Sequence, residues 1–230
     1  MTAPTYIDDY TRPVRFHPAS TALLVIDMQY ASGSRRHGLG KLLAAQGKLA
    51  EAEYRFHRID TLVVPNIRRL IAAFRSVRAR VLYVTYGSQL PDHGDAPPQL
   101  KKWLVATHNH AGAREHEIVD ELKPEPGDLV LNKNTMGAFG STGIDAHLKS
   151  LGIHELVVTG VSTNNCVGMT AQEASDRQYG VAIVSDATGT CSDAMQEAYL
   201  ATWRRLWGRV AATDEVIAEL LAAAGTRKTG

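Results

Sequence analysis

The sequence has few cysteines, few aromatic residues and no long apolar run. Two cysteines in 230 residues are too few for the disulfide framework of a small secreted protein. The first sixteen residues contain no apolar segment of a signal peptide, and the longest uncharged stretch, 156–172, is interrupted by polar side chains. We therefore expect a cytoplasmic protein without a membrane segment, in a reducing compartment that keeps its cysteines as thiols.

A surplus of one charge is also absent. The 25 Lys and Arg residues are balanced by 24 Asp and Glu residues, and the formal net charge is +1. This balance argues against nucleic acid or an acidic membrane surface as a partner and favours a small, weakly charged ligand. With 44% hydrophobic and 21% charged residues, the chain has the composition of a globular protein. We expect one domain, 1–230.

Short apolar runs alternate with longer amphipathic segments, which is typical of repeated β-α units. The runs predict strands at Thr21–Ile26, Arg80–Thr85, Leu129–Asn132, Glu155–Thr159, Val181–Ser185 and Arg209–Ala212. The amphipathic segments predict helices at 60–76, 145–151, 167–178, 192–205 and 214–224. The expected fold is a three-layer α/β/α domain with a six-stranded, mainly parallel sheet, for which right-handed crossovers allow the order 3-2-1-4-5-6.

Three segments lie outside this alternation. Residues 1–20 form an N-terminal extension, and 31–58 and 86–118 are insertions that follow the first and second strands. Because open α/β sheets bind ligands at the carboxyl ends of their strands, we expect the two insertions to form lids or pocket walls. The alternative is that they cover apolar surface or make a subunit contact.

Three polar residues lie where predicted strands end or a helix begins. Asp27 follows the first strand, Lys133 follows the third, and Cys166 opens the helix after the fourth. Taken singly, these would be a cap, a surface charge and a small buried residue. Together they provide a nucleophile, a base and a cation, and the lysine and the helix dipole are expected to lower the pKa of the Cys166 thiol.

Four motifs carry a resemblance to a known family. They are V-I-D-M-Q at 25–29, the run ending in L-V-L-N-K at 129–133, G-A-F-x-x-T at 137–142 and G-V-S-T-N-N-C-V at 160–167. With these motifs the chain resembles the isochorismatase-like cysteine hydrolases, in particular the amidohydrolases that act on ureidoacrylate, N-carbamoylsarcosine and biuret. The resemblance implies that Cys166 is the nucleophile, Asp27 the base and then the acid, and Lys133 the residue that orients Asp27.

The resemblance also implies an oxyanion hole. In the family a cis peptide bond precedes the residue four positions before the cysteine, which here is the bond between Val161 and Ser162. The expected donors are the backbone N–H groups of Ser162 and Cys166. Members of the family commonly form homo-dimers or homo-tetramers, so the resemblance implies an oligomer as well.

Substrate-binding residues are harder to assign from the sequence. The expected set is Tyr30, which replaces an aromatic wall found in many members, Gln89 after the second strand, Phe139 and Asn165. Phe139 is as consistent with the core as with the site. Cys191 has no basic residue close in sequence and is interpreted as structural.

No metal or other cofactor is predicted. The metal-binding branch of the family has an Asp-x-His spacing after the second strand, whereas this chain has adjacent Asp92 and His93. His108, His110 and His116 are interpreted as loop residues because they lack the spacing of a zinc or iron site.

The sequence therefore predicts a metal-independent cysteine amidohydrolase. It would cleave a C–N bond of a small amide, ureide or carbamoyl compound through a thioester and release ammonia or an amine. A vinyl-ether hydrolase of the isochorismatase type is a second possibility, although that reaction needs no thiol. A non-catalytic binding protein on the same fold is a third, and a redox role for Cys166 is a fourth.

Overall fold

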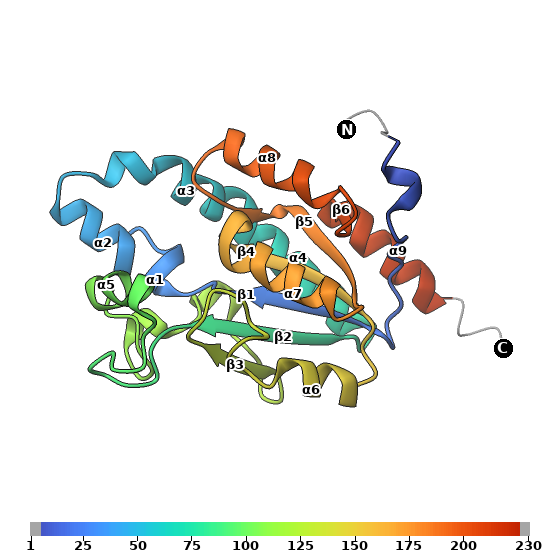
Figure 1. The fold of residues 1–230 in the computed structure, drawn as a ribbon, viewed down its shortest axis with the longest axis horizontal. Helices are drawn as coiled ribbons and strands as arrows, with labels where there is room; N and C mark the ends of the chain where they lie inside the picture. Colours follow the sequence, from blue (N-terminus) through green and yellow to red (C-terminus); the bar gives the residue numbers. More distant parts are fainter. Residues whose placement is uncertain (1–5, 226–230) are drawn as a thin grey trace.

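The computed structural model describes residues 6–225 and contains the six-stranded sheet that the sequence predicts (Figure 1). The strands are β1 Thr21–Ile26, β2 Arg80–Tyr86, β3 Leu129–Lys133, β4 Glu155–Val161, β5 Gly180–Gly189 and β6 Arg209–Ala211. Their order is β3-β2-β1-β4-β5-β6, and every neighbouring pair is parallel. The predicted class and strand order are confirmed.

Helices surround the sheet. They are α1 Tyr30–Gly33, α2 Gly38–Ala45, α3 Glu53–Arg58, α4 Val64–Ser76, α5 Pro98–Ala106, α6 Ile144–Ser150, α7 Gly168–Asp176, α8 Asp193–Trp203 and α9 Thr213–Gly225. Short 3₁₀ turns are η1 Asp8–Tyr10, η2 Leu49–Ala52, η4 Arg114–His116 and η5 Asp120–Leu122. Two π-helical turns, η3 Ile59–Val63 and η6 Thr163–Val167, lead directly into α4 and α7.

Each strand sends alternate side chains to opposite faces of the sheet, and helices bury both faces. Leu23 and Val25 of β1 lie in an apolar cluster with residues of α4 and α9. Leu24 and Ile26 lie in a second cluster with residues of α6, α7 and α8. Burial on both faces explains why the strands are continuous apolar runs in the sequence.

Two elements differ from the sequence prediction by four residues or more. Strand β5 continues to Gly189, four residues beyond the predicted end at Ser185. The helix predicted to begin at Asp60, with Pro65 in its first turn, is the last part of a helical run that begins at Glu53. A proline removes one backbone donor inside a helix, and the π-helical turn Ile59–Val63 immediately before it is a local irregularity of the kind that accommodates such a loss.

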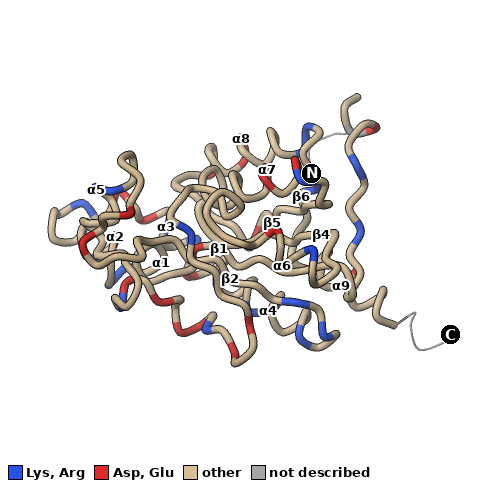
Figure 2. The backbone as a smooth tube through the Cα atoms, turned by 60° about the horizontal axis from the view of Figure 1, so that its bottom comes forward, with Lys and Arg blue, Asp and Glu red and all other residues tan. Residues whose placement is uncertain are grey.

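Both insertions lie at the carboxyl ends of the strands. Figure 1 shows α1, α2 and α5 gathered at the end of the sheet to which the arrows of β1 and β2 point. In the tube of Figure 2, Lys and Arg are interspersed with Asp and Glu along the chain. Within residues 6–225, none of the helices has the length and apolar character needed to cross a bilayer.

Gly160 allows β4 to approach β1 at the edge that carries the polar residues. Its φ is +109°, and a Cβ atom built there would lie 2.0 Å from the carbonyl oxygen of Ile26. Gly112 also has a positive φ, +87°, but no atom lies within 4 Å of its Cβ position. Gly160 is therefore required both by its positive φ and by the lack of space for a side chain next to Ile26, whereas Gly112 is favoured by its φ alone.

We expect Gly160→Ala to lower the free energy of unfolding by at least about 2 kcal/mol, because strain and overpacking add. Gly112→Ala should cost about 1 kcal/mol, because only the backbone conformation is strained. Urea unfolding of both variants measures the difference. Equal losses would show that the contact with Ile26 is relieved without cost.

Candidate active site

Asp27 stands directly after β1 and is almost completely buried. Its φ is +52°, a conformation that aspartate tolerates better than most residues. The backbone N–H donates to the carbonyl oxygen of Val84, at 2.8 Å, and the Asp27 carbonyl oxygen accepts from the hydroxyl of Ser32, at 2.6 Å. These bonds fix the carboxylate at the carboxyl edge of the sheet.

Lys133 ends β3 and is fully buried beside Asp27. Its Nζ lies 3.0 Å from Asp27 Oδ2 and 3.2 Å from the carbonyl oxygen of Thr135, to both of which it donates. The same ammonium group lies 4.4 Å from the centre of the Tyr86 ring, so the aromatic face adds a favourable contact with the cation. The other carboxylate oxygen, Asp27 Oδ1, has no hydrogen-bond partner within residues 6–225.

Cys166 lies within the π-helical turn Thr163–Val167, between β4 and α7. Its Sγ lies 3.4 Å from Sδ of Met136. The thiol is also close enough to Asp27 and Lys133 for both groups to influence its pKa. The structure therefore brings the three residues of the predicted triad together at one edge of the sheet.

The direction of the Cys166 pKa shift corrects the sequence prediction. Burial raises the pKa of the thiol to about 12, and the negative charge of Asp27 adds to the increase, whereas Lys133 opposes it. The expected lowering is wrong because the loss of water around the sulfur outweighs the lysine. At neutral pH the resting residue is a thiol, which must lose its proton to become a nucleophile.

The two partners of Cys166 are also shifted. Burial raises the pKa of Asp27 above 3.8, although Lys133 partly offsets this effect. For Lys133, burial lowers the pKa, but the charge of Asp27 and the influence of Cys166 outweigh it, so that the pKa is raised overall. A carboxylate with a raised pKa is better suited to accept a proton and return it.

The bond between Val161 and Ser162 is cis in the structure. It lies between β4 and the turn that contains Cys166. The hydroxyl of Ser162 accepts a hydrogen bond, at 2.8 Å, from Nη1 of Arg55 in α3. Residues of the first insertion therefore contact the segment in which the oxyanion hole is predicted.

A cavity of about 270 Å³ opens at this edge of the sheet, close to the small end of the range for ligand pockets. Asp27, Ser162 and Cys166 line it, together with Gln29, Ser32, Leu39, Arg55, Tyr86, Leu100, Trp103, Asn109, Met136, Val161, Asn165 and Cys191. Both insertions contribute to this lining, through α2 and α3 from the first and α5 from the second. The interpretation of the insertions as pocket walls fits this arrangement.

Of the four residues expected to bind substrate, Asn165 lines the cavity and the other three do not. Tyr30 begins α1 and turns towards the second insertion, where its ring lies 4.0 Å below the Arg114 guanidinium and its hydroxyl accepts from the Asp120 N–H. The aromatic wall consists instead of Tyr86 and Trp103, whose ring centres are 5.9 Å apart.

Gln89 and Phe139 lie away from the cavity lining for different reasons. Gln89 is exposed, and its backbone N–H donates to Asp95. Phe139 belongs to the apolar cluster beneath α6, α7 and α8, with its ring 6.0 Å from that of Tyr179. Its interpretation as a core residue is the one that the structure supports.

Sequence reasoning misses several residues of the lining. The sequence favours a structural role for Cys191, but this residue is exposed and lines the cavity, because β5 extends farther than predicted towards the carboxyl edge. Arg55 lies in an insertion whose sequence has no motif. Neither Cys191 nor Arg55 belongs to a sequence motif or has neighbours in the sequence that indicate a functional site. Only the folded structure shows that both line the cavity.

Buried polar side chains hold the second insertion against the site. The amide of Gln29 donates to the carbonyl oxygens of Tyr86 and His116, and its oxygen accepts from the Tyr86 N–H. Asn109 donates to the same Tyr86 oxygen and contacts His116 Nδ1 at 2.9 Å. Burial lowers the pKa of His116 to about 4, so the ring is neutral at pH 7.

The described part of the chain contains no group of three or more His, Cys, Asp or Glu side chains arranged to hold a metal ion. His93 and His110 pack edge to face, with ring centres 5.4 Å apart, and His116 is occupied by Gln29 and Asn109. His93 and His110 lie outside the helices and named strands of the second insertion, and His116 ends the 3₁₀ turn Arg114–His116.

Comparison with known proteins places this site in a family. The model of the isochorismatase domain matches residues 21–215, which include all six strands and the three central residues of the site. The chain belongs to the isochorismatase family. It is 34% identical over 189 residues to ureidoacrylate amidohydrolase RutB of Pantoea ananatis, covering 76% of this chain and 71% of the relative.

Solved structures of the family have the same architecture. A cysteine hydrolase from Pseudomonas syringae superposes with a TM-score of 0.76 at 23% identity, over 97% of this chain and 100% of that one. N-carbamoylsarcosine amidase from Thermoplasma acidophilum superposes with a TM-score of 0.63 at 28% identity, over 85% of this chain and 97% of that one. The first likeness concerns the fold alone.

The raised pKa of Cys166 predicts an unusual pH dependence of alkylation. In a Cys191→Ala protein, the rate of carboxymethylation of Cys166 by iodoacetamide should increase about tenfold per pH unit from about pH 7 to 10, because only the thiolate reacts. Mass spectrometry of the Cys166 peptide measures this rate.

The same protein unfolded in urea provides the control. Its thiol has an ordinary pKa of about 8.5, so its rate should level off near about pH 9. A rate that levels off below about pH 8 in the folded protein would show that the resting site holds a thiolate, contrary to the effect of burial.

Proposed function

We propose that this isochorismatase-family protein is a cysteine amidohydrolase that cleaves a C–N bond of a small amide, ureide or carbamoyl compound. The observation that carries the proposal is the buried Asp27 carboxylate. One of its oxygens accepts from Lys133, and the other has no donor among residues 6–225 while the Cys166 thiol lies nearby. This arrangement suits a base that takes the thiol proton.

The proposed reaction has two stages. Asp27 accepts the proton of Cys166 as Sγ attacks the substrate carbonyl carbon, and the carbonyl oxygen becomes an oxyanion facing the N–H groups of Ser162 and Cys166. The C–N bond then breaks, and Asp27 gives its proton to the departing ammonia or amine. In the second stage Asp27 takes a proton from water as the water oxygen attacks the thioester carbonyl carbon. The C–S bond then breaks, the acid product leaves, and Asp27 returns its proton to Sγ to restore the Cys166 thiol.

Lys133 has two roles in this scheme. Its hydrogen bond holds Oδ2 of Asp27 so that Oδ1 is presented to the sulfur, and its charge stabilises the thiolate as the thiolate forms. The relatives named ureidoacrylate amidohydrolase and N-carbamoylsarcosine amidase support the choice of a ureide or carbamoyl group. Assembly into a dimer or tetramer stays a prediction of the family resemblance.

Cys166→Ala should reduce ammonia release from any ureide that the wild-type protein hydrolyses by at least about a thousandfold, because the nucleophile is lost. A screen of small amides, ureides and carbamoyl compounds, assayed for ammonia, identifies the substrate, and thermal unfolding checks that the variant is folded. Full activity in the variant would exclude the thioester route. Pyruvate release from an isochorismate-like acid, without ammonia release from amides, would support vinyl-ether hydrolysis instead.

We also expect the activity to be independent of metal ions. The proposed steps use only Asp27, Lys133, Cys166 and two backbone N–H groups. Dialysis against EDTA should therefore leave kcat/KM within about twofold of the untreated value. Loss of activity that added zinc or manganese restores would contradict this expectation.

A further inference from the structure

Arg55 is a buried cation on the wall of the cavity. It lies on α3, is 8% exposed, and lines the cavity together with Cys166 and Asp27. Burial lowers the pKa of its guanidinium, although arginine remains charged at neutral pH. A charge in such a position is costly unless another group compensates it.

No carboxylate of the described residues lies within ion-pair distance of Arg55. Glu53, on the same helix, pairs with Arg35 instead, at 2.5 Å, and Asp60 also bonds to Arg35. Asp27 influences Arg55 only from a distance, and its own charge is matched by Lys133. The cavity with its ion pair therefore carries one uncompensated positive charge.

The guanidinium also retains donors. Nε and Nη2 donate to the carbonyl oxygen of Ser32, at 3.2 and 3.0 Å, and Nη1 donates to Ser162 Oγ. Three of the five N–H bonds of an arginine are used in this way, which leaves one on each terminal nitrogen. The other side chains that influence Arg55 are Cys191, whose sulfur is a weak acceptor, Cys166 and Asp27.

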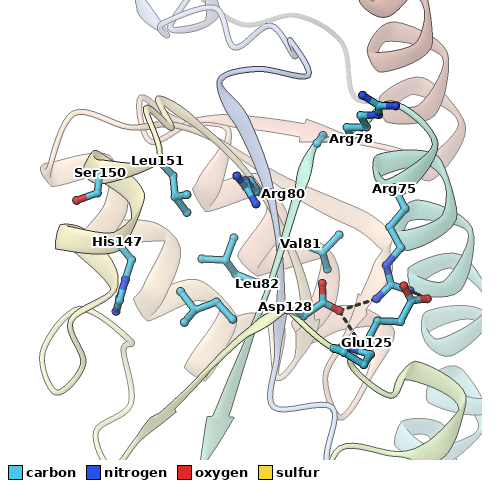
Figure 3. Close-up of a pocket in the computed structure, with 14 residues that line it drawn as sticks. Arg75, Arg78, Arg80, Val81, Leu82, Glu125, Asp128, His147, Ser150 and Leu151 are labelled. Atoms are coloured by element: carbon cyan, nitrogen blue, oxygen red, sulfur yellow. Dashed lines mark hydrogen bonds and ion pairs between the residues drawn. The ribbon is translucent and has the colours of Figure 1, made fainter.

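Arg75 shows how carboxylates compensate an arginine elsewhere in the structure. A hollow of about 580 Å³ lies at the opposite, amino-terminal ends of β2 and β3 (Figure 3). Its Arg75 is bound by Glu125 and Asp128, at 2.6 Å each, as the dashed lines in Figure 3 show. Arg55 at the active-site cavity has no such carboxylate partner among the described residues.

We infer that Arg55 binds a carboxylate of the substrate and that the protein acts on ureido or amido acids in preference to neutral amides. A carboxylate would supply the missing negative charge and accept from both terminal nitrogens of the guanidinium. The apolar wall of Leu100, Trp103 and Tyr86 would contact the carbon chain between the two polar ends. The inference rests on the proposed amidohydrolase function and assigns its specificity.

Two substrates that differ only in charge test this inference. 3-Ureidopropionate carries the carboxylate, and 3-methylbutylurea has an isopropyl group of similar shape in its place. For the wild-type protein we expect kcat/KM to be about 100-fold higher for the acid. Arg55→Met should remove most of this preference, mainly through a higher KM for the acid.

The ratio of the two kcat/KM values does not depend on how much of a variant is folded. Arg55→Lys keeps the charge without the planar fork, so it should retain part of the preference. Arg58→Met is the matched control, because Arg58 lies on the same helix but donates to the carbonyl oxygens of Ser185 and Thr188 and does not line the cavity. Its preference should equal that of the wild type.

Two results would overturn the inference. If Arg55→Met slows both substrates equally, Arg55 positions the segment at Ser162 or stabilises the thiolate and does not bind the substrate anion. The same conclusion follows if the wild-type protein shows no preference for the acid.

Binding separates this inference from the proposed function. We expect calorimetry with Cys166→Ala to detect 3-ureidopropionate, and Cys166→Ala/Arg55→Met to bind it at least about tenfold more weakly. Binding that depends on Arg55 without turnover by the wild type would refute the amidohydrolase proposal alone. Turnover without an effect of charge would refute the role of Arg55 alone, and absence of both binding and turnover would refute the two together.

Discussion

The ion pair between Asp27 and Lys133 is the interaction on which the site depends. It joins the end of β1 to the end of β3 across β2, and both side chains are almost completely removed from water. A buried pair of this kind contributes little net stability, but the loss of one partner leaves an uncompensated charge in the interior. The sheet order places the two strand ends within reach of each other, and Gly160 and the Asp27 N–H bond fix the adjoining backbone.

The same pair influences the protonation state of the cysteine. Burial and the negative charge of Asp27 raise the pKa of the Cys166 thiol, and Lys133 only partly offsets this increase. A protonated sulfur is protected from oxidants and alkylating agents, because these react with the thiolate. In the proposed reaction, proton transfer to Asp27 would form the nucleophile within the site.

Much of the fold could be predicted because strands buried on both faces leave short, continuous apolar runs that alternate with longer amphipathic segments. Right-handed crossovers restricted the possible orders of the strands, and Asp27, Lys133 and Cys166 could be found because they stand where strands end or a helix begins. The direction of the shift in the thiol pKa could not be predicted, because it depends on how much water the folded chain excludes.

The near-zero net charge suggested a weakly charged ligand, yet the local charge at Arg55 is set by which side chains meet in the cavity. Tyr30 shows the same limit, because the turn into α1 directs its ring to Arg114 and away from the cavity.

The π-helical turn at Ile59–Val63 joins the helix that covers the sheet to the helix that carries Arg55. Successive residues of an α-helix are rotated by about 100° around its axis. Adding or removing one residue in this turn would therefore rotate the side chains of α3 around the helix axis relative to those of α4. Contacts with the core fix which side of α4 faces the sheet. Because the helical run is continuous through the turn, they also fix which side of α3 faces the cavity. The direction in which Arg55 enters the cavity therefore depends on the helical register of a segment that does not itself line the cavity.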